Sequence, residues 1–216
     1  MSNLQKLNAQ YIAYIIKYPL LTKSITAGVF SGLNETVSSV LTNEYKETTV
    51  AGLKIKHVFS EKLLTMVIYG SCIATPISHF MYQIINTKLF KGPLTSKGKI
   101  LRILTSLSTV TPTLSACFVS WISLINNYKL PKEGFNVAAE LKRIVGTVRA
   151  GLKKGYLPVL KSSLVVSSCA LVVAQKFVPP ELWVVFFNLV YFFLGTYQNT
   201  KLKRLQKQQR LLKKDE

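Results

Sequence analysis

The stretch LLTMVIYGSCIATPISHFMYQIINT, residues 63–87, contains no Asp, Glu, Lys or Arg, and neither does ILTSLSTVTPTLSACFVSWISLINNY, residues 103–128. A helix rises 1.5 Å per residue, so about 20 apolar residues cross the ~30 Å hydrocarbon core of a bilayer. Both stretches exceed that length. We therefore predict that each of them crosses a membrane as a helix.

Three further segments are candidates for the membrane. Residues 182–200 are uncharged, rich in aromatic side chains and long enough to cross. Residues 20–41 are apolar but contain Glu35, whereas residues 157–177 have a short uncharged centre and are expected to span or to re-enter. The sequence thus predicts an all-α, polytopic membrane helix bundle with four to five hydrophobic segments, in a single integral membrane domain over residues 1–216. The orientation in the membrane stays open.

The charges are segregated from the apolar segments. The chain has 28 Lys and Arg against 9 Asp and Glu, yet 49% of its residues are hydrophobic. A nucleic-acid-binding protein would interleave its basic residues with aromatics, so we expect a lipid bilayer with an anionic surface as partner and no nucleic acid. Residues 3–18 and 136–155 are predicted as amphipathic helices at the membrane interface, and 201–216 as a solvated basic tail. The expected membrane-surface contacts are Lys142, Arg143, Arg149, Lys153, Lys154, Lys201 and Arg204.

Chemical groups for catalysis or metal binding are sparse. Cys72, Cys117 and Cys169 stand alone in different apolar runs, and the two histidines are His57 and His79. No spacing matches a metal site, a redox pair, a phosphate loop or a catalytic nucleophile. We predict no catalytic residues, no metal and no cofactor, and hence no enzyme.

Small and polar residues share one face within most of the predicted membrane helices. One interpretation is that they let helices approach closely and bond to one another. The other is that several such faces converge on a hydrated path for solutes. Glu35 fits either an ion pair or such a path, because a charge in an apolar segment needs a partner or a cavity. The candidates for path lining or helix packing are Gly28, Gly32, Glu35, Thr75, His79, Tyr82 and Asn188.

The opening of the chain resembles a known family. Residues 18–28, YPLLTKSITAG, followed by 31–35, SGLNE, are similar to the opening signature of the Mpv/PMP family of small peroxisomal and mitochondrial inner-membrane proteins. Residues 153–156, KKGY, and 177–179, FVP, agree with later family blocks in order and spacing. The chain departs from the family pattern around 167–174, where a Trp-Pro pair with downstream Gln and Asn is missing.

The resemblance implies a peroxisomal multi-pass membrane protein, closest to the branch of twenty-two-kilodalton peroxisomal proteins. It implies channel-like passage of small hydrophilic metabolites, a homo-oligomer, and delivery by the peroxisomal membrane-protein import machinery. A structural or partner-binding membrane protein without transport activity is the alternative function. The mitochondrial inner membrane is one alternative location. The endoplasmic reticulum membrane is another, because Lys213 and Lys214 have the form of a dilysine retrieval signal.

Overall fold

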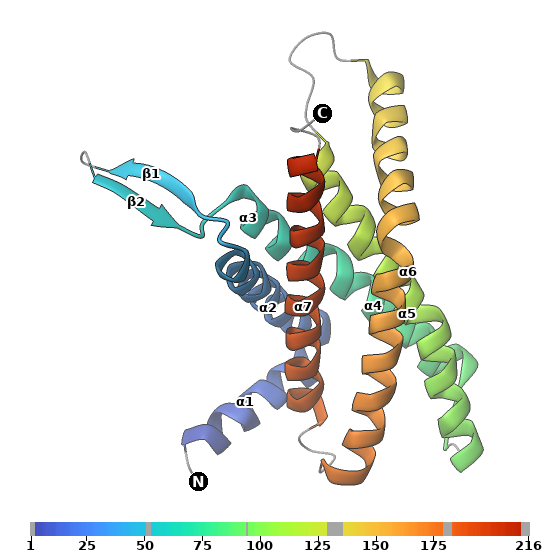
Figure 1. Ribbon diagram of the computed structural model, residues 1–216. Helices are drawn as coiled ribbons and strands as arrows, with labels where there is room; N and C mark the ends of the chain where they lie inside the picture. The colour runs from blue at the N-terminus through green and yellow to red at the C-terminus, as the bar shows by residue number, and fades with distance from the viewer. Residues whose placement is uncertain (1–2, 51–52, 94, 129–135, 179–182, 213–216) are drawn as a thin grey trace.

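The computed structural model describes residues 3–50, 53–93, 95–128, 136–178 and 183–212, and most of these residues are helical (Figure 1). In chain order the elements are α1 (Asn3–Lys17), α2 (Pro19–Thr42), β1 (Lys46–Val50), β2 (Leu53–His57), α3 (Glu61–Ile68), a π-helical turn (Tyr69–Ala74), α4 (Thr75–Ile84), a second π-helical turn (Ile85–Leu89), α5 (Ser96–Asn127), α6 (Val137–Phe177) and α7 (Trp183–Leu212).

Local sequence explains where the helices begin. Pro19 opens α2, because proline has the helical φ angle and its missing N–H would be unpaired in the first turn. The side chains of Ser60, Thr95 and Asn136 cap α3, α5 and α6 by accepting hydrogen bonds from first-turn backbone N–H groups. At its other end α2 stops at Asn43, which takes the left-handed conformation with φ of 54°.

From α3 to the second π-helical turn, residues 61–89 form one continuous helical rod. Pro76 has no N–H to donate to the preceding turn, and the helix widens into the π-helical turn directly before it. The hydroxyl of Thr75 donates to the carbonyl oxygen of Gly70 at 2.8 Å, so a polar side chain supports the altered turn. The proline therefore modifies the predicted 63–87 segment without ending it.

The rods close into a ring. α2 packs against α7 on one side and against the 61–89 rod on the other, the 61–89 rod packs against α5, α5 against α6, and α6 against α7 (Figure 1). Inside, the buried side chains of Met66, Tyr69 and Ile122 form a core on which Trp121 packs. The indole of Trp121 donates to the carbonyl oxygen of Thr65 at 3.1 Å, which ties α5 to α3.

α2 presents its apolar side outward. Gly28, Glu35, Ser38 and Ser39 are buried, while the opposite face is a stripe of exposed apolar residues: Leu21, Ile25, Val29, Leu33, Val37 and Val40. This pattern reverses that of a helix in a water-soluble bundle. It is the pattern expected when lipid solvates the outer face.

Three helices are long and apolar enough to cross a bilayer by length and composition, within the residues that the structure describes: Glu61–Leu89, Ser96–Asn127 and Val137–Ala174. The predicted class, an all-α membrane helix bundle, is confirmed. That four to five segments cross the membrane stays a prediction.

The structure joins segments of the C-terminal half that the sequence predicts as separate. Residues 136–155 and 157–177 fall in one helix, because α6 runs unbroken for 41 residues, about 60 Å, and that its first part lies at the membrane interface stays a prediction. Gly151 and Gly155, just before the predicted boundary, pack against Ser123 and Val119 of α5. Residues 201–212 continue α7 as one helix with buried positions, whereas 213–216, with the dilysine, lie outside the described residues.

The hairpin of β1 and β2 was not predicted. The strands pair antiparallel, from Lys46 opposite His57 to Val50 opposite Leu53, and the hairpin projects away from the ring of helices (Figure 1). Its signal in the sequence is short: β-branched Thr48, Thr49 and Ile55 among charged residues.

Two glycines of α6 provide a matched test of the α5–α6 contact. A Cβ on Gly151 would overlap the hydroxyl of Ser123 and lie 2.5 Å from its Cβ, whereas a Cβ on Gly146 would meet nothing within 4 Å. We expect Gly151→Ala to lower the free energy of unfolding by about 1–3 kcal/mol through overpacking. Gly146→Ala should raise it by up to about 1 kcal/mol, because alanine favours the helix. Unfolding of both variants by dodecyl sulfate in mixed micelles measures the difference, and equal effects would contradict this account of the contact.

Candidate functional site

Glu35 sits at the centre of a buried polar cluster between α2 and α7. Its carboxylate is 2.6 Å from the Nζ of Lys203, and the side chains of these residues are 2% and 5% exposed. Asn199 donates from Nδ2 to the other carboxylate oxygen at 2.8 Å, and Lys203 also donates to the Oγ of Ser39 at 2.8 Å. We call these four residues the Glu35 cluster.

The Glu35 cluster is balanced in charge and tightly packed. Glu44 lies 3.4 Å from the Nζ of Lys203, and Lys62 lies 3.9 Å from Glu44, so two carboxylates face two ammonium groups. The cavity that adjoins Glu35, Asn199 and Lys203 measures about 10 Å³. A space of that size holds at most one water molecule. On this side the carboxylate of Glu35 is therefore occupied by its partners. Glu35 and Ser39 also border a second cavity of about 390 Å³, which is lined mainly by residues of α2, β1 and α3.

Gly28, Gly32 and Thr75 lie at contacts between or within helices. A Cβ on Gly28 would be 3.3 Å from the Cβ of Ser71, and one on Gly32 would be 3.1 Å from a methyl carbon of Val67. These glycines bring α2 close to the 61–89 rod. Thr75 is buried, and its hydroxyl is used by the backbone of its own helix.

The remaining candidates for path lining do not join the Glu35 cluster. His79 is half-buried beside Phe80, with ring centres 5.8 Å apart, and Tyr82 is 44% exposed. In the part of the chain that the structure describes, no hydrogen bond joins either of them to Glu35. Asn188 belongs to α7, but its side chain lies outside the described residues.

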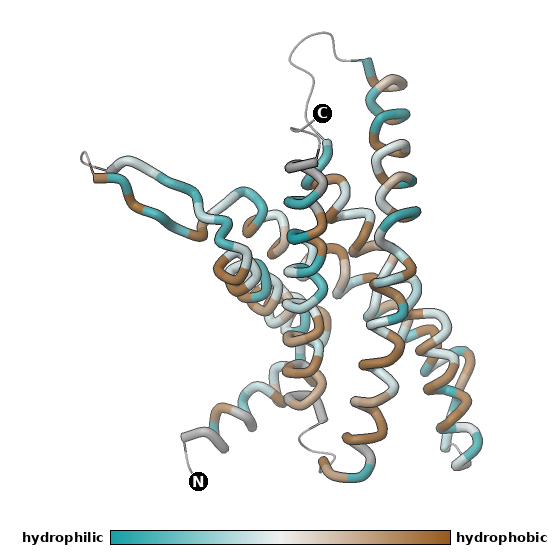
Figure 2. The backbone as a smooth tube through the Cα atoms, viewed as in Figure 1, coloured by the Kyte–Doolittle hydropathy of each residue, from teal (hydrophilic) through white to brown (hydrophobic). Residues whose placement is uncertain are grey.

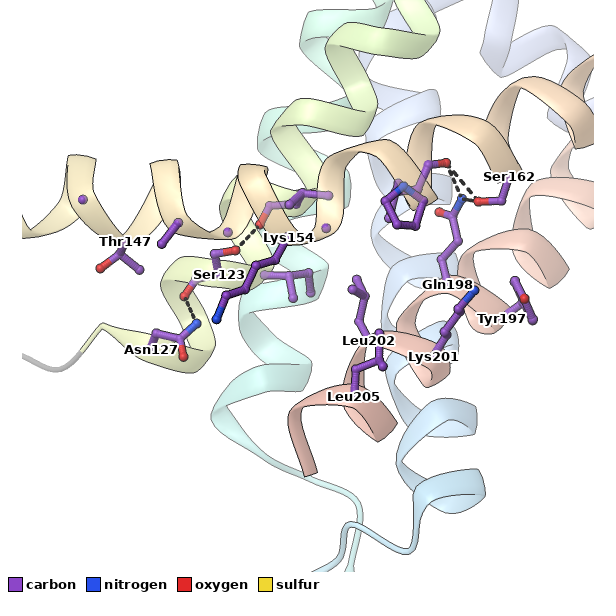
Figure 3. Close-up of a pocket in the computed structure, with 18 of the residues that line it drawn as sticks. Ser123, Asn127, Thr147, Lys154, Ser162, Tyr197, Gln198, Lys201, Leu202 and Leu205 are labelled. Carbon is purple, nitrogen blue, oxygen red and sulfur yellow. Dashed lines mark hydrogen bonds between the residues drawn. The ribbon is translucent and has the colours of Figure 1, made fainter. Parts of the chain in front are cut away.

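A larger cavity of about 600 Å³ opens between α5, α6 and α7 (Figure 3). We call it the α5–α6–α7 cleft. Among the predicted surface contacts, Arg143, Lys154 and Lys201 line it. The other members of that set are exposed and do not: Lys142, Arg149, Lys153 and Arg204.

The sequence did not single out two of the residues that matter most here. Lys203 falls in the predicted solvated tail, and Asn199 was placed at the end of the last membrane segment. Helical spacing was the signal in the sequence that could have identified them, because Thr196, Asn199 and Lys203 lie on one face of α7. Thr196 extends the same contact by donating to Oδ1 of Asn34 at 2.5 Å.

The chemistry of the site is that of binding and packing. Across the described ranges, no three His, Cys, Asp or Glu side chains gather closely enough to hold a metal ion. The cleft contributes ammonium groups, amides and hydroxyls beside apolar side chains. Such a surface is suited to an anion or to an amphipathic ligand.

The buried ion pair between Glu35 and Lys203 predicts how substitutions change the free energy of unfolding. Lys203→Met should lower the free energy of unfolding by about 3–5 kcal/mol, because it leaves the buried carboxylate of Glu35 without a cation. Glu35→Gln should also lower it, but by less, because Lys203 keeps the partly exposed Glu44 at 3.4 Å. The loss in free energy of unfolding of the double variant should be smaller than the sum of the losses of the two single variants. Unfolding by dodecyl sulfate in mixed micelles checks both expectations.

The exposed pair of Glu47 and Lys56, 3.6 Å apart in the hairpin, is the control. Glu47→Gln should change the free energy of unfolding by less than about 1 kcal/mol, because solvent screens that pair. Additive losses at Glu35 and Lys203, or losses no larger than at Glu47, would show that the buried pair does not hold α2 to α7.

Comparison with known proteins agrees with a membrane bundle of this kind. The Mpv17 / PMP22 family profile matches residues 140–199. The Woronin body membrane protein of Aspergillus fumigatus is 36% identical over 92% of this chain and 78% of its own length. The Woronin sorting complex protein of Neurospora crassa is 32% identical over 90% of this chain, which spans only 57% of that relative.

A third relative, peroxisomal membrane protein PMP22 of Arabidopsis thaliana, is 23% identical over 91% of this chain and 90% of its own length. No solved structure matches the chain. The family profile covers most of α6 and the first part of α7, up to residue 199, and the relatives extend the similarity across almost the whole chain. The chain therefore belongs to the Mpv17 / PMP22 family of membrane proteins.

Proposed function

We propose that this chain is a peroxisomal membrane protein that acts, without enzymatic activity, by holding partner proteins at the membrane. The observation that carries the proposal is the closed Glu35 cluster. The charged group that a solute path through the bundle would use is bound to Lys203 and Asn199, and the cavity beside these partners is about 10 Å³. The other cavity that Glu35 borders, about 390 Å³, is lined mainly by α2, β1 and α3 and does not reach Asn199 or Lys203. The polar faces of α2 and α7 are thus used to hold the helices together.

The projecting hairpin supports the same function. Leu53 and Ile55 of β2 are 70% and 48% exposed, and they lie on one face because side chains alternate along a strand. A two-stranded hairpin alone is marginally stable in water, so this one gains from a protein laid against it. Two relatives carry names that refer to a Woronin body membrane and to a Woronin sorting complex. Participation in a membrane complex is consistent with both names.

The hairpin allows a matched experiment. We expect the native protein, extracted from membranes in mild detergent, to sediment in a complex larger than the purified chain. Leu53→Ser with Ile55→Ser should shift it to the size of the purified chain, because these changes remove the apolar face. Lys54→Ser with Lys56→Ser changes the other face of the same strand and should leave the complex intact. Equal sedimentation of native and purified protein would contradict the proposal.

A solute path is the second candidate function, and the α5–α6–α7 cleft is the observation that favours it. The cleft measures about 600 Å³, and Lys154 and Lys201 would concentrate anionic metabolites there. Reconstitution of the pure protein into liposomes decides between the candidates. Flux above that of empty vesicles, reduced by Lys154→Met with Lys201→Met, would establish a path. Absence of flux in every oligomeric state would leave partner binding.

The peroxisomal membrane is the proposed location, supported by the similarity to peroxisomal membrane protein PMP22. We also propose that the peroxisomal import machinery delivers the chain and that it forms homo-oligomers. A fluorescent fusion should coincide with a peroxisomal marker and not with mitochondrial or endoplasmic-reticulum markers. Coincidence with either of the others would replace the proposed location by that membrane.

A further inference from the structure

The α5–α6–α7 cleft lies where the apolar parts of two helices end. Residues 157–177 of α6 and 183–200 of α7 are each about 30 Å long at 1.5 Å per residue, close to the thickness of a hydrocarbon core. Beyond them both helices become basic, and Figure 2 shows α6 and α7 largely brown in their lower halves, with teal turns alternating with brown ones in their upper halves. The cleft therefore lies at the level of the lipid headgroups.

The two cleft lysines come from facing helices at one height. A Cβ on Gly155 of α6 would lie 3.9 Å from Cδ2 of Leu202 of α7, so these two positions are level with each other. Lys154 and Lys201 directly precede them in the sequence, and both side chains line the cleft (Figure 3). Lys154 thus borders the opening from α6 and Lys201 borders it from α7. Figure 3 shows the ammonium group of Lys154 on the side of Asn127 and that of Lys201 beside Tyr197.

The lining combines this positive charge with an apolar wall. Val119, Ile122, Leu202 and Leu205 supply apolar surface from α5 and α7. Hydroxyl and amide groups also line the cleft, from Ser123, Asn127 and Thr147. The residues that line it include neither Asp nor Glu.

Other cations and amides near the cleft already have partners. Arg143 donates to Glu140 at 2.7 Å, and Gln198 donates to Ser162 and Ser163 at 2.9 Å. Lys201 lies 5.9 Å from the ring centre of Tyr197, and no ion pair with an acidic residue is found for Lys154 or Lys201 within the described ranges. The unmatched positive charge of the cleft is therefore on these two lysines.

We propose that the α5–α6–α7 cleft binds one anionic phospholipid from the surrounding leaflet. Its phosphate binds to Lys154 and Lys201, whose long side chains turn toward it, and the first part of its acyl chains lies along Leu202 and Leu205. The charge complementarity selects an anionic headgroup. The apolar wall selects a lipid over a free phosphate, because a free phosphate would leave that wall in contact with water. The site does not depend on whether the protein binds partners or passes solutes.

The test measures binding of fluorescent phosphatidic acid to the full chain in nanodiscs of phosphatidylcholine. Lys154→Met with Lys201→Met should weaken binding roughly tenfold or more, because each lysine near a lipid headgroup contributes on the order of 1 kcal/mol. Lys153→Met with Lys207→Met is the matched control, since it removes two exposed lysines of the same helices outside the cleft. Binding in the control should stay within about twofold of the unmodified chain, well inside that tenfold change.

A second variant tests the cleft by shape. Ala150 lines the cleft about one helical turn before Lys154 and is exposed, so Ala150→Phe should fold and occupy the lipid's place. Loss of lipid binding in this variant, with unchanged thermal stability, supports the site. Equal weakening by the cleft and control lysine pairs would show general surface attraction and overturn the proposal. Displacement of the lipid by equimolar inorganic phosphate would also overturn it, since the site would then select the free anion.

Discussion

The ion pair between Glu35 and Lys203 is the interaction on which the closure of the bundle depends. It joins α2 to α7 across 168 residues of sequence, at positions where both side chains are almost fully buried. A buried charge without its partner is strongly unfavourable, so the two helices cannot separate without exposing both charges to a medium of low polarity. Asn199 and Ser39 complete the hydrogen bonds, and the ring of helices therefore closes at this point.

Small residues determine how closely the other helices approach. Lipid is as apolar as the outer face of a helix, so hydrophobic burial contributes little to helix association within a bilayer. Gly28 and Gly32 bring α2 against Val67, and Gly151 brings α6 against Ser123. The polar faces of the helices are thus largely used in contacts between helices, while the exposed stripe of α2 faces lipid.

The same construction leaves an opening of about 600 Å³ between α5, α6 and α7. α6 and α7 contact each other through Gln198 and the serines of α6, and at the level of Lys154 and Lys201 a cleft lies between them. Their basic ends consequently form a common surface beside the headgroups.

The sequence by itself determined the membrane class and the helical positions of residues 63–87 and 103–128, because long uncharged apolar runs have few other stable states in a cell. It also identified Glu35 as a residue that requires a partner or a cavity. Only the tertiary structure decided that the partner is Lys203. The local sequence pattern predicts that a lysine in a basic tail faces solvent. Lys203 is buried because α2 lies alongside α7. The cleft likewise exists only because residues near 154 and 201, far apart in the sequence, are level across two facing helices.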